Sequence, residues 1–98
     1  MSDASLPGAA LVREVTVVNL RGLHARAAAR FVVTAERFDA AVEVARDGQE
    51  VSARSIMGLM MLGAGRGAVI TLRAEGWDAR EALDALAALV ESGFHEGE

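Results

Sequence analysis

The sequence contains no cysteine and only two histidines, His24 and His95. Without cysteine the chain has no disulfides, no thiolate metal sites and no cysteine nucleophile. Two histidines are too few for a histidine-based metal site unless carboxylates complete it. Three phenylalanines and one tryptophan are the only aromatic residues, which leaves little surface for stacking nucleic-acid bases. We therefore expect no metal, no cofactor and no nucleic-acid partner.

Long hydrophobic runs are also missing. No stretch approaches the roughly 18 apolar residues of a membrane-spanning helix, and the first residues lack the basic segment and apolar core of a secretory signal. We therefore expect a cytoplasmic protein without a membrane partner. Apolar residues still make up 52% of the 98 residues, which is enough for one domain to bury a core.

The charge is unevenly distributed. The formal net charge is −4, yet residues 19–66 hold seven arginines against five acidic residues, whereas residues 74–98 hold one arginine against seven. The acidic total argues against bulk binding of nucleic acid. A basic face in the first half would instead suit an acidic protein partner.

The hydrophobic pattern predicts seven elements in the order β-α-β-β-α-β-α. Strands are expected over 11–18, 40–46, 50–53 and 68–74, and helices over 25–36, over 55–63 and from 78 onward. This order fits an α+β fold, an open-faced β-sandwich in which three helices pack on one face of a four-stranded antiparallel sheet. Residues 1–10 are expected to be a flexible lead, 11–91 the domain, and 92–98 a tail in which His95 is disordered.

Local signals mark the ends of these elements. Asp47-Gly48 between alternating segments predicts a two-residue hairpin. Ser55 is expected to cap the short middle helix. Asp78, with Glu81 three residues on, predicts a capping box at the start of the last helix.

The segment Arg21-Gly22-Leu23-His24-Ala25-Arg26 runs against ordinary helix electrostatics. The start of a helix exposes N–H groups and carries partial positive charge, so acidic residues normally stand there. Here an imidazole and a guanidinium occupy the first turn. One interpretation is a histidine that caps the helix beside a solvated arginine. The other is an anion site, since N–H groups, the helix dipole and a guanidinium together suit a phosphate.

The middle helix is apolar on more faces than two turns can bury. Leu59 and Leu62 lie one turn apart and are expected to face the core. Ile56, Met57 and Met60 point elsewhere, either as additional core or as an exposed docking surface. Methionine suits such a surface because it adapts to several partners.

Two segments together, Gly22-Leu23-His24-Ala25-Arg26 and Ser55-Ile56-Met57-Gly58-Leu59, resemble the HPr family, the histidine phosphocarriers of the bacterial phosphotransferase system. The resemblance covers residues 11–91. It implies a phosphoryl carrier rather than an enzyme. His24 would accept the phosphoryl group on Nδ1 from the phosphohistidine of enzyme I and pass it to a histidine of an EIIA-type protein.

The resemblance also implies roles for other residues. Arg26 would pair with the phosphoryl oxygens, together with the backbone N–H groups of Ala25 and Arg26. Ser55 would be the target of an HPr kinase/phosphorylase. Ile56, Met57, Met60 and Arg30 would dock partners, and the carrier would be a monomer. One departure from the family pattern is Ala27, which stands where many HPr proteins have proline.

Two alternatives remain open at this point. A small sheet with helices on one face also fits a ferredoxin-like regulatory or binding module. An HPr-like adaptor that acts by docking alone is the second alternative, although the intact His24 and Arg26 argue against it.

Overall fold

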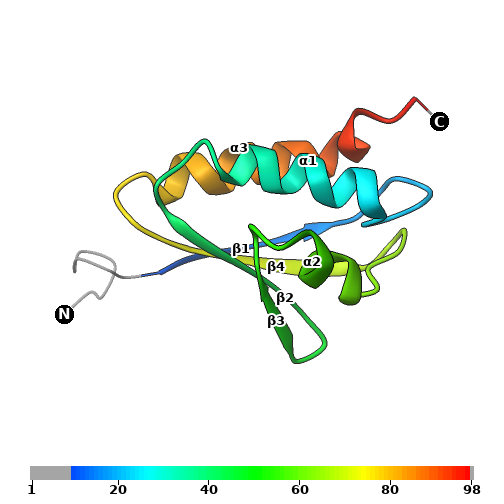
Figure 1. The fold of residues 1–98 in the computed structure, drawn as a ribbon, viewed down its shortest axis with the longest axis horizontal. Coiled ribbons are helices and arrows are strands. Elements are labelled where there is room, and N and C mark those ends of the chain that lie inside the picture. The colour runs from blue at the N-terminus through cyan, green and yellow to red at the C-terminus, as the bar shows by residue number, and fades with distance from the viewer. Residues whose placement is uncertain (1–9, 98) are drawn as a thin grey trace.

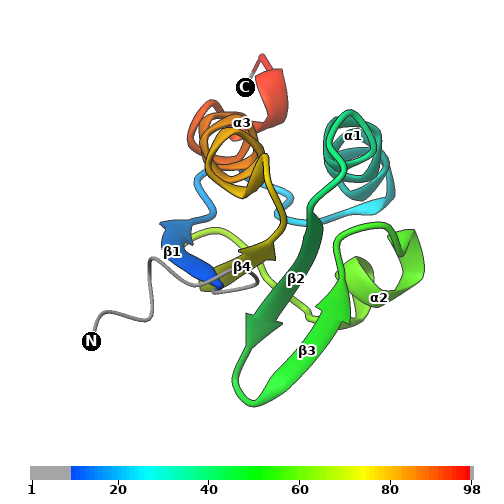
Figure 2. The same ribbon diagram turned by 90° about the vertical axis from the view of Figure 1, so that its left-hand side faces the viewer.

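The computed structural model describes residues 10–97, so the predicted lead over 1–10 lies outside the described residues except for Ala10. Figures 1 and 2 show a sheet with the helices on one of its faces. The predicted fold class is confirmed. The elements are β1 (Leu11–Thr16), α1 (Ala25–Ala35), β2 (Ala41–Arg46), β3 (Gln49–Ser52), α2 (Ile56–Met61), β4 (Val69–Glu75), α3 (Ala79–Glu91) and a short 3₁₀ helix (Gly93–His95).

The sheet has the strand order β1-β4-β2-β3, and all its pairs are antiparallel. The last strand therefore lies between the first two, and Leu11 pairs with Ala74. Neighbouring β2 and β3 form the predicted hairpin, in which Arg46 pairs with Gln49. Asp47 and Gly48 both have positive φ, at 52° and 82°, as a type I′ turn requires.

The core lies between the helices and one face of the sheet. Four residues spaced three and four apart form the buried face of α1: Ala28, Phe31, Val32 and Ala35. The apolar stripe of α3 is buried as well: Ala79, Leu83, Leu86 and Val90. In β4, alternate side chains enter this core while Val69 is 49% exposed, so the opposite face of the sheet stays open.

The predicted capping box at the start of α3 is wrong. Asp78 occupies the N-cap position, but its side chain makes no cap hydrogen bond. Its carboxylate instead accepts hydrogen bonds from the backbone N–H groups of Asp39 (2.9 Å) and Ala40 (2.9 Å). Because Asp78 is only 6% exposed, this buried carboxylate ties the loop after α1 to the start of α3.

No helix among residues 10–97 is long and apolar enough to cross a bilayer. The same residues contain no group of three or more histidine, aspartate or glutamate side chains placed to hold a metal ion.

Candidate functional site

His24 stands at the N-cap position of α1, with extended backbone angles (φ −72°, ψ 177°). Its carbonyl oxygen accepts the N–H of Ala28 at 2.8 Å, which begins the helix. Its side chain makes no capping hydrogen bond. The backbone N–H groups of Ala25, Arg26 and Ala27 consequently have no hydrogen-bond partner within the described chain. The positive end of α1 is open beside the imidazole.

The turn before His24 sets the backbone position from which the imidazole extends. Gly22 has a φ of +65° and lies close to the loop before β4. A Cβ added at Gly22 would lie 2.8 Å from the Cα of Gly65. Leu23 is 5% exposed, and its N–H donates to the carbonyl oxygen of Ala64 at 3.0 Å. The segment from Ala64 to Gly65 therefore supports this turn from the side.

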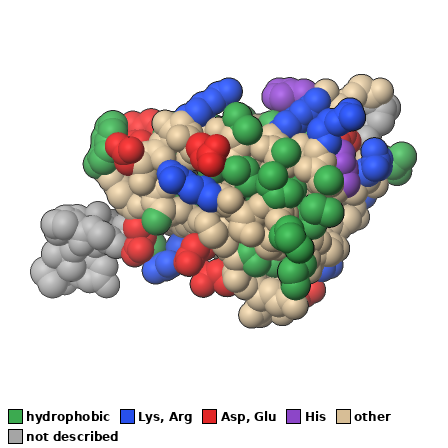
Figure 3. Space-filling model, in the orientation of Figure 1, with side chains coloured by type: hydrophobic (Ala, Val, Ile, Leu, Met, Phe, Trp, Pro, Cys, Tyr) green, Lys and Arg blue, Asp and Glu red, His purple; other side chains and the backbone are tan. Residues whose placement is uncertain are grey.

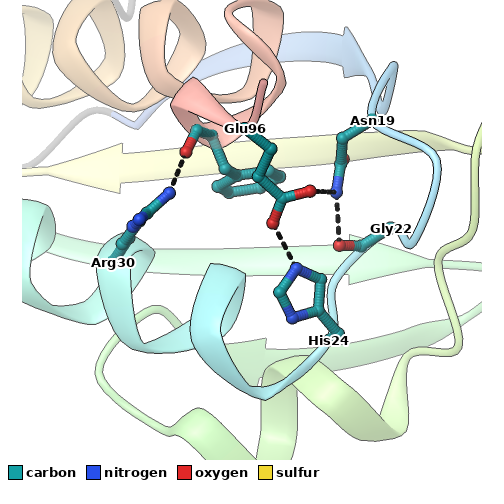
Figure 4. Close-up of polar contacts among 6 residues, drawn as sticks. Asn19, Gly22, His24, Arg30 and Glu96 are labelled. Atoms are coloured by element: carbon teal, nitrogen blue, oxygen red, sulfur yellow. Dashed lines mark hydrogen bonds and ion pairs between the residues drawn. The ribbon is translucent and has the colours of Figure 1, made fainter. Parts of the chain in front are cut away.

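The imidazole of His24 faces the C-terminal segment of the chain. Nε2 of the ring is hydrogen-bonded to the carboxylate of Glu96, which lies 72 residues further along the sequence. Both side chains are largely enclosed, with exposed fractions of 14% and 16%. The other ring nitrogen, Nδ1, points away from Glu96 (Figure 4) and makes no hydrogen bond to residues 10–97. The two nitrogens thus have different surroundings.

Asn19 links Glu96 to the turn before His24. Its amide nitrogen donates to the Gly22 carbonyl at 2.8 Å and to the Glu96 carboxylate at 3.1 Å (Figure 4). Asn19 is 1% exposed, and its Oδ1 is buried without a hydrogen-bond partner among residues 10–97. Because both partners, the Gly22 carbonyl and the Glu96 carboxylate, are acceptors, the nitrogen of the Asn19 amide must be the atom that faces the site.

The C-terminal segment differs from the polar tail that the sequence suggested. Gly93–His95 forms a 3₁₀ helix in which Phe94 is fully buried, with a φ of 58°. Arg30 of α1 donates to the carbonyl oxygen of Phe94 (Figure 4). His95, predicted to be disordered, lies in this turn with its side chain exposed. The anchored Phe94 brings Glu96 back onto His24.

The electrostatics of Glu96 reflect this packing. The hydrogen bond from His24 lowers the pKa of the Glu96 carboxyl below its usual value, against partial desolvation, which raises it. The hydrogen bond from Asn19 and the nearby charge of Arg21 lower this pKa further. Glu96 is therefore held as a carboxylate beside the ring.

The two arginines of the site behave differently. Arg26 is exposed and makes no hydrogen bond or ion pair with residues 10–97, so its guanidinium is free to meet a ligand. Arg30, by contrast, is half-buried and donates a hydrogen bond to the Phe94 carbonyl oxygen.

Ser55 caps α2 as predicted, since its hydroxyl accepts the Gly58 N–H at 2.9 Å. Leu59 and Leu62 are buried, as expected. Four apolar side chains of α2 are exposed and form what we call the α2 patch: Ile56 (41%), Met57 (73%), Met60 (43%) and Met61 (74%). Figure 3 shows hydrophobic side chains gathered over α2, with arginines beyond them. Met61 was not predicted to be part of a docking surface, although a helix as short as α2 cannot bury side chains on every face.

The α2 patch reaches the imidazole. A hollow of about 330 Å³ is lined by His24 and Met60, with Arg21 and the loop from Gly63 to Gly65 around them. The structure therefore brings together His24 and one edge of the α2 patch. Ser55 is not among the residues that line this hollow.

Comparison with known proteins identifies the family. The family model described as "PTS HPr component phosphorylation site" matches residues 11–92. The chain belongs to the HPr family. The phosphocarrier protein HPr of Cupriavidus necator is 49% identical over 88 residues, which are 90% of this chain and 99% of that protein. The phosphocarrier protein NPr of Shewanella violacea is 46% identical over 86 residues, 88% of this chain and 94% of its own.

The fold agrees with that of solved HPr proteins. The structure of HPr from Thermoanaerobacter tengcongensis superimposes with a TM-score of 0.85 at 45% identity, over 90% of this chain and 99% of that one. In this fold the Ala27 N–H has no hydrogen-bond partner among residues 10–97, so proline at this position would break no hydrogen bond there.

Proposed function

We propose that this HPr-family protein accepts a phosphoryl group on Nδ1 of His24 from the phosphohistidine of enzyme I and passes it to a histidine of an EIIA-type protein. The observation that carries the proposal is the open start of α1. Nδ1 lacks a hydrogen-bond partner within residues 10–97, and His24 is the N-cap residue directly before the unpaired N–H groups of Ala25 and Arg26. Unpaired N–H groups at the positive end of a helix bind phosphate oxygens.

Arg26 supports the proposal through its position. Its exposed guanidinium follows the helix start by one residue and has no competing partner among residues 10–97. A guanidinium binds two phosphate oxygens at once and adds charge to the dipole of the helix.

A carrier must release the group that it accepts. Transfer between two histidines proceeds in line, and the protein contributes position and charge rather than new covalent chemistry. The open helix start and the exposed guanidinium of Arg26 would hold the phosphoryl group without enclosing it. Stronger binding of the phosphorylated ground state would slow release to the next histidine.

The α2 patch and Arg30 are the surface that we propose for docking enzyme I and EIIA-type proteins, one monomer of the carrier to each. The patch adjoins the hollow at His24 through Met60. Exposed methionines adapt to differently shaped partners, which a carrier meets in turn.

Ser55 caps the start of α2. We propose that an HPr kinase/phosphorylase phosphorylates it.

Labelling with phosphoenolpyruvate and cognate enzyme I tests the transfer. The wild-type protein should acquire acid-labile phosphate, His24→Ala should acquire none, and His95→Ala should be labelled like the wild type. Label that persists in His24→Ala would assign the phosphoryl group to another residue. A wild-type protein that binds active enzyme I without becoming labelled would identify an adaptor that acts by docking alone.

Ser55→Asp tests the proposed regulation. We expect weaker binding to enzyme I, because a charge at the start of α2 stands beside the α2 patch. Ser52→Asp is the matched control, since it adds the same charge at an exposed position three residues earlier on β3. Equal affinity of the Ser55→Asp variant and the wild type, measured by calorimetric titration, would reject the regulation through the patch.

A further inference from the structure

The contact between Glu96 and Nε2 of His24 has no part in the proposed transfer, which uses Nδ1. We propose that Glu96 is a positioning residue that keeps a proton on Nε2 of His24 in both the unphosphorylated and the phosphorylated protein. Nδ1 is thereby left with the lone pair that attacks phosphorus. This inference rests on the proposed function and adds to it a residue from the other end of the chain.

Glu96 is placed for this role by a built set of contacts. The carboxylate bridges two groups, with one oxygen on Nε2 of His24 and the other on the amide of Asn19. The segment that carries it is anchored by the fully buried Phe94, whose carbonyl oxygen accepts a hydrogen bond from Arg30. Gly93 packs against Asn19, where an added Cβ would stand 3.5 Å from the Asn19 Cβ. Glu96 is thus held on the ring rather than resting there by chance.

The tautomer follows from the chemistry of the pair. A carboxylate has no proton to donate, so a neutral ring that is hydrogen-bonded to it must carry its proton on the facing nitrogen. That nitrogen is Nε2. A partner at one ring nitrogen in this way decides which nitrogen remains free to react.

The acceptance step then needs no proton transfer. The lone pair of Nδ1 forms a bond to phosphorus while the bond between phosphorus and the donor histidine breaks, and its electron pair stays on the donor nitrogen. The proton remains on Nε2 throughout. The product ring is a cation, and the carboxylate of Glu96 compensates its charge through a charge-assisted hydrogen bond.

The release step benefits from the same proton. When the next histidine attacks phosphorus, the bonding pair returns to Nδ1, and the ring departs as a neutral imidazole. Without a proton on Nε2 the ring would have to leave as an imidazolate anion, which is a far poorer leaving group. One carboxylate therefore serves both directions of the relay.

A simple charge effect predicts the opposite result, which makes the inference testable. The phosphoryl group is negatively charged, so a carboxylate nearby would only repel it, and removing Glu96 would speed phosphorylation. If Glu96 acts through the tautomer, removing it slows phosphorylation. We expect Glu96→Ala to lower the rate by about tenfold, the effect of losing one charge-assisted hydrogen bond.

The experiment compares three full-length variants in phosphorylation by phosphorylated enzyme I and in nitrogen-15 NMR of the imidazole. Glu96→Ala removes the contact, and Glu96→Gln keeps an acceptor oxygen but no charge. Glu91→Ala removes a carboxylate from the exposed end of α3 and serves as the matched control. The wild type and Glu91→Ala should show Nε2–H almost exclusively at a pH where the ring is neutral, and Glu96→Ala the mixture found for free histidine.

The expected order of rates is wild type and Glu91→Ala first, Glu96→Gln next and Glu96→Ala slowest. An unchanged or faster Glu96→Ala, or an unchanged tautomer ratio in that variant, would overturn the inference. The NMR measurement uses the unphosphorylated protein. A wild type that enzyme I fails to phosphorylate therefore contradicts the proposed function, while the tautomer ratio still decides the role of Glu96.

Discussion

The carbonyl oxygen of Ala64 lies against Gly22, in the space that a side chain at position 22 would occupy. Gly22→Ala combines this overlap with a φ of +65°, which disfavours any residue with a Cβ. We expect the free energy of unfolding to fall by about 2–4 kcal/mol, measured by urea denaturation.

Gly48→Ala is the matched control for this prediction. Its φ is +82°, but no atom of residues 10–97 lies within 4 Å of the added Cβ, so only the backbone strain remains. That strain costs about 1 kcal/mol. Equal losses in the two variants would show that the contact with Ala64 does not matter.

Removing the Asp78 carboxylate should also destabilise the fold. Asp78→Ala leaves the N–H groups of Asp39 and Ala40 without their acceptor in a buried setting. Loss of hydrogen bonds to a buried charged group costs about 2–4 kcal/mol. Asp84→Ala, which breaks only the exposed pair with Arg13, should cost under about 1 kcal/mol by the same denaturation measurement. A similar small loss for Asp78→Ala would contradict the structural role.

The start of α3 shows one limit of sequence analysis. An aspartate before an apolar helix, followed by a glutamate three residues later, looks the same in the sequence in two cases. Its carboxylate can cap its own helix, or it can accept hydrogen bonds from the backbone of a distant loop. The position of the helix could be predicted, because the spacing of its apolar residues is local. The acceptor role of Asp78 could not be predicted, because it depends on where residues 39–40 arrive in the fold.

The contact between Glu96 and His24 should depend on pH. The pKa of the Glu96 carboxyl is lowered in the folded protein, chiefly by the hydrogen bond from His24. Its stabilising contribution is therefore fully present above the ordinary glutamate pKa of about 4.3 and is lost as the pH falls through the lowered value. In His24→Ala, the Glu96 titration followed by carbon-13 NMR should move up toward that ordinary value.

His95→Ala is the control for this titration, because it alters a neighbouring histidine that makes no hydrogen bond to Glu96 through its side chain. The Glu96 midpoint should stay at the wild-type value in that variant. An upward shift of equal size in both variants would assign the lowered pKa to the local turn instead of the contact with His24.

Proline at position 27 should be accommodated. The Ala27 N–H has no partner among residues 10–97, so Ala27→Pro breaks no hydrogen bond there and reduces the freedom of the unfolded chain. We expect a gain of about 0.4–1 kcal/mol, seen as a higher melting temperature. Ala28→Pro removes the N–H that bonds His24 at 2.8 Å and should cost about 3 kcal/mol. A lower melting temperature for Ala27→Pro would contradict this account.

The candidate site, like the fold, has residues that could be predicted from the sequence and residues that could not. His24, Arg26 and Ser55 could be placed from the sequence because each stands at a helix start with local signals. Asn19 and Glu96 could not, since a loop asparagine and a glutamate near the chain end carry no periodic pattern. The signal that remained was Phe94, an aromatic residue in an otherwise polar segment, whose burial brings Glu96 to the ring.

The strand order also sets the order in which the chain can fold. The β2–β3 hairpin closes over two residues, whereas β1 pairs with β4 across most of the domain, for example Leu11 with Ala74. Contacts between distant segments form late, because closing a long loop costs entropy before any contact compensates for it. The turn before His24 also depends on a distant segment, because the Leu23 N–H donates to the carbonyl oxygen of Ala64. During synthesis, the site around His24 cannot be complete until Glu96, which follows the final strand and α3, has left the ribosome.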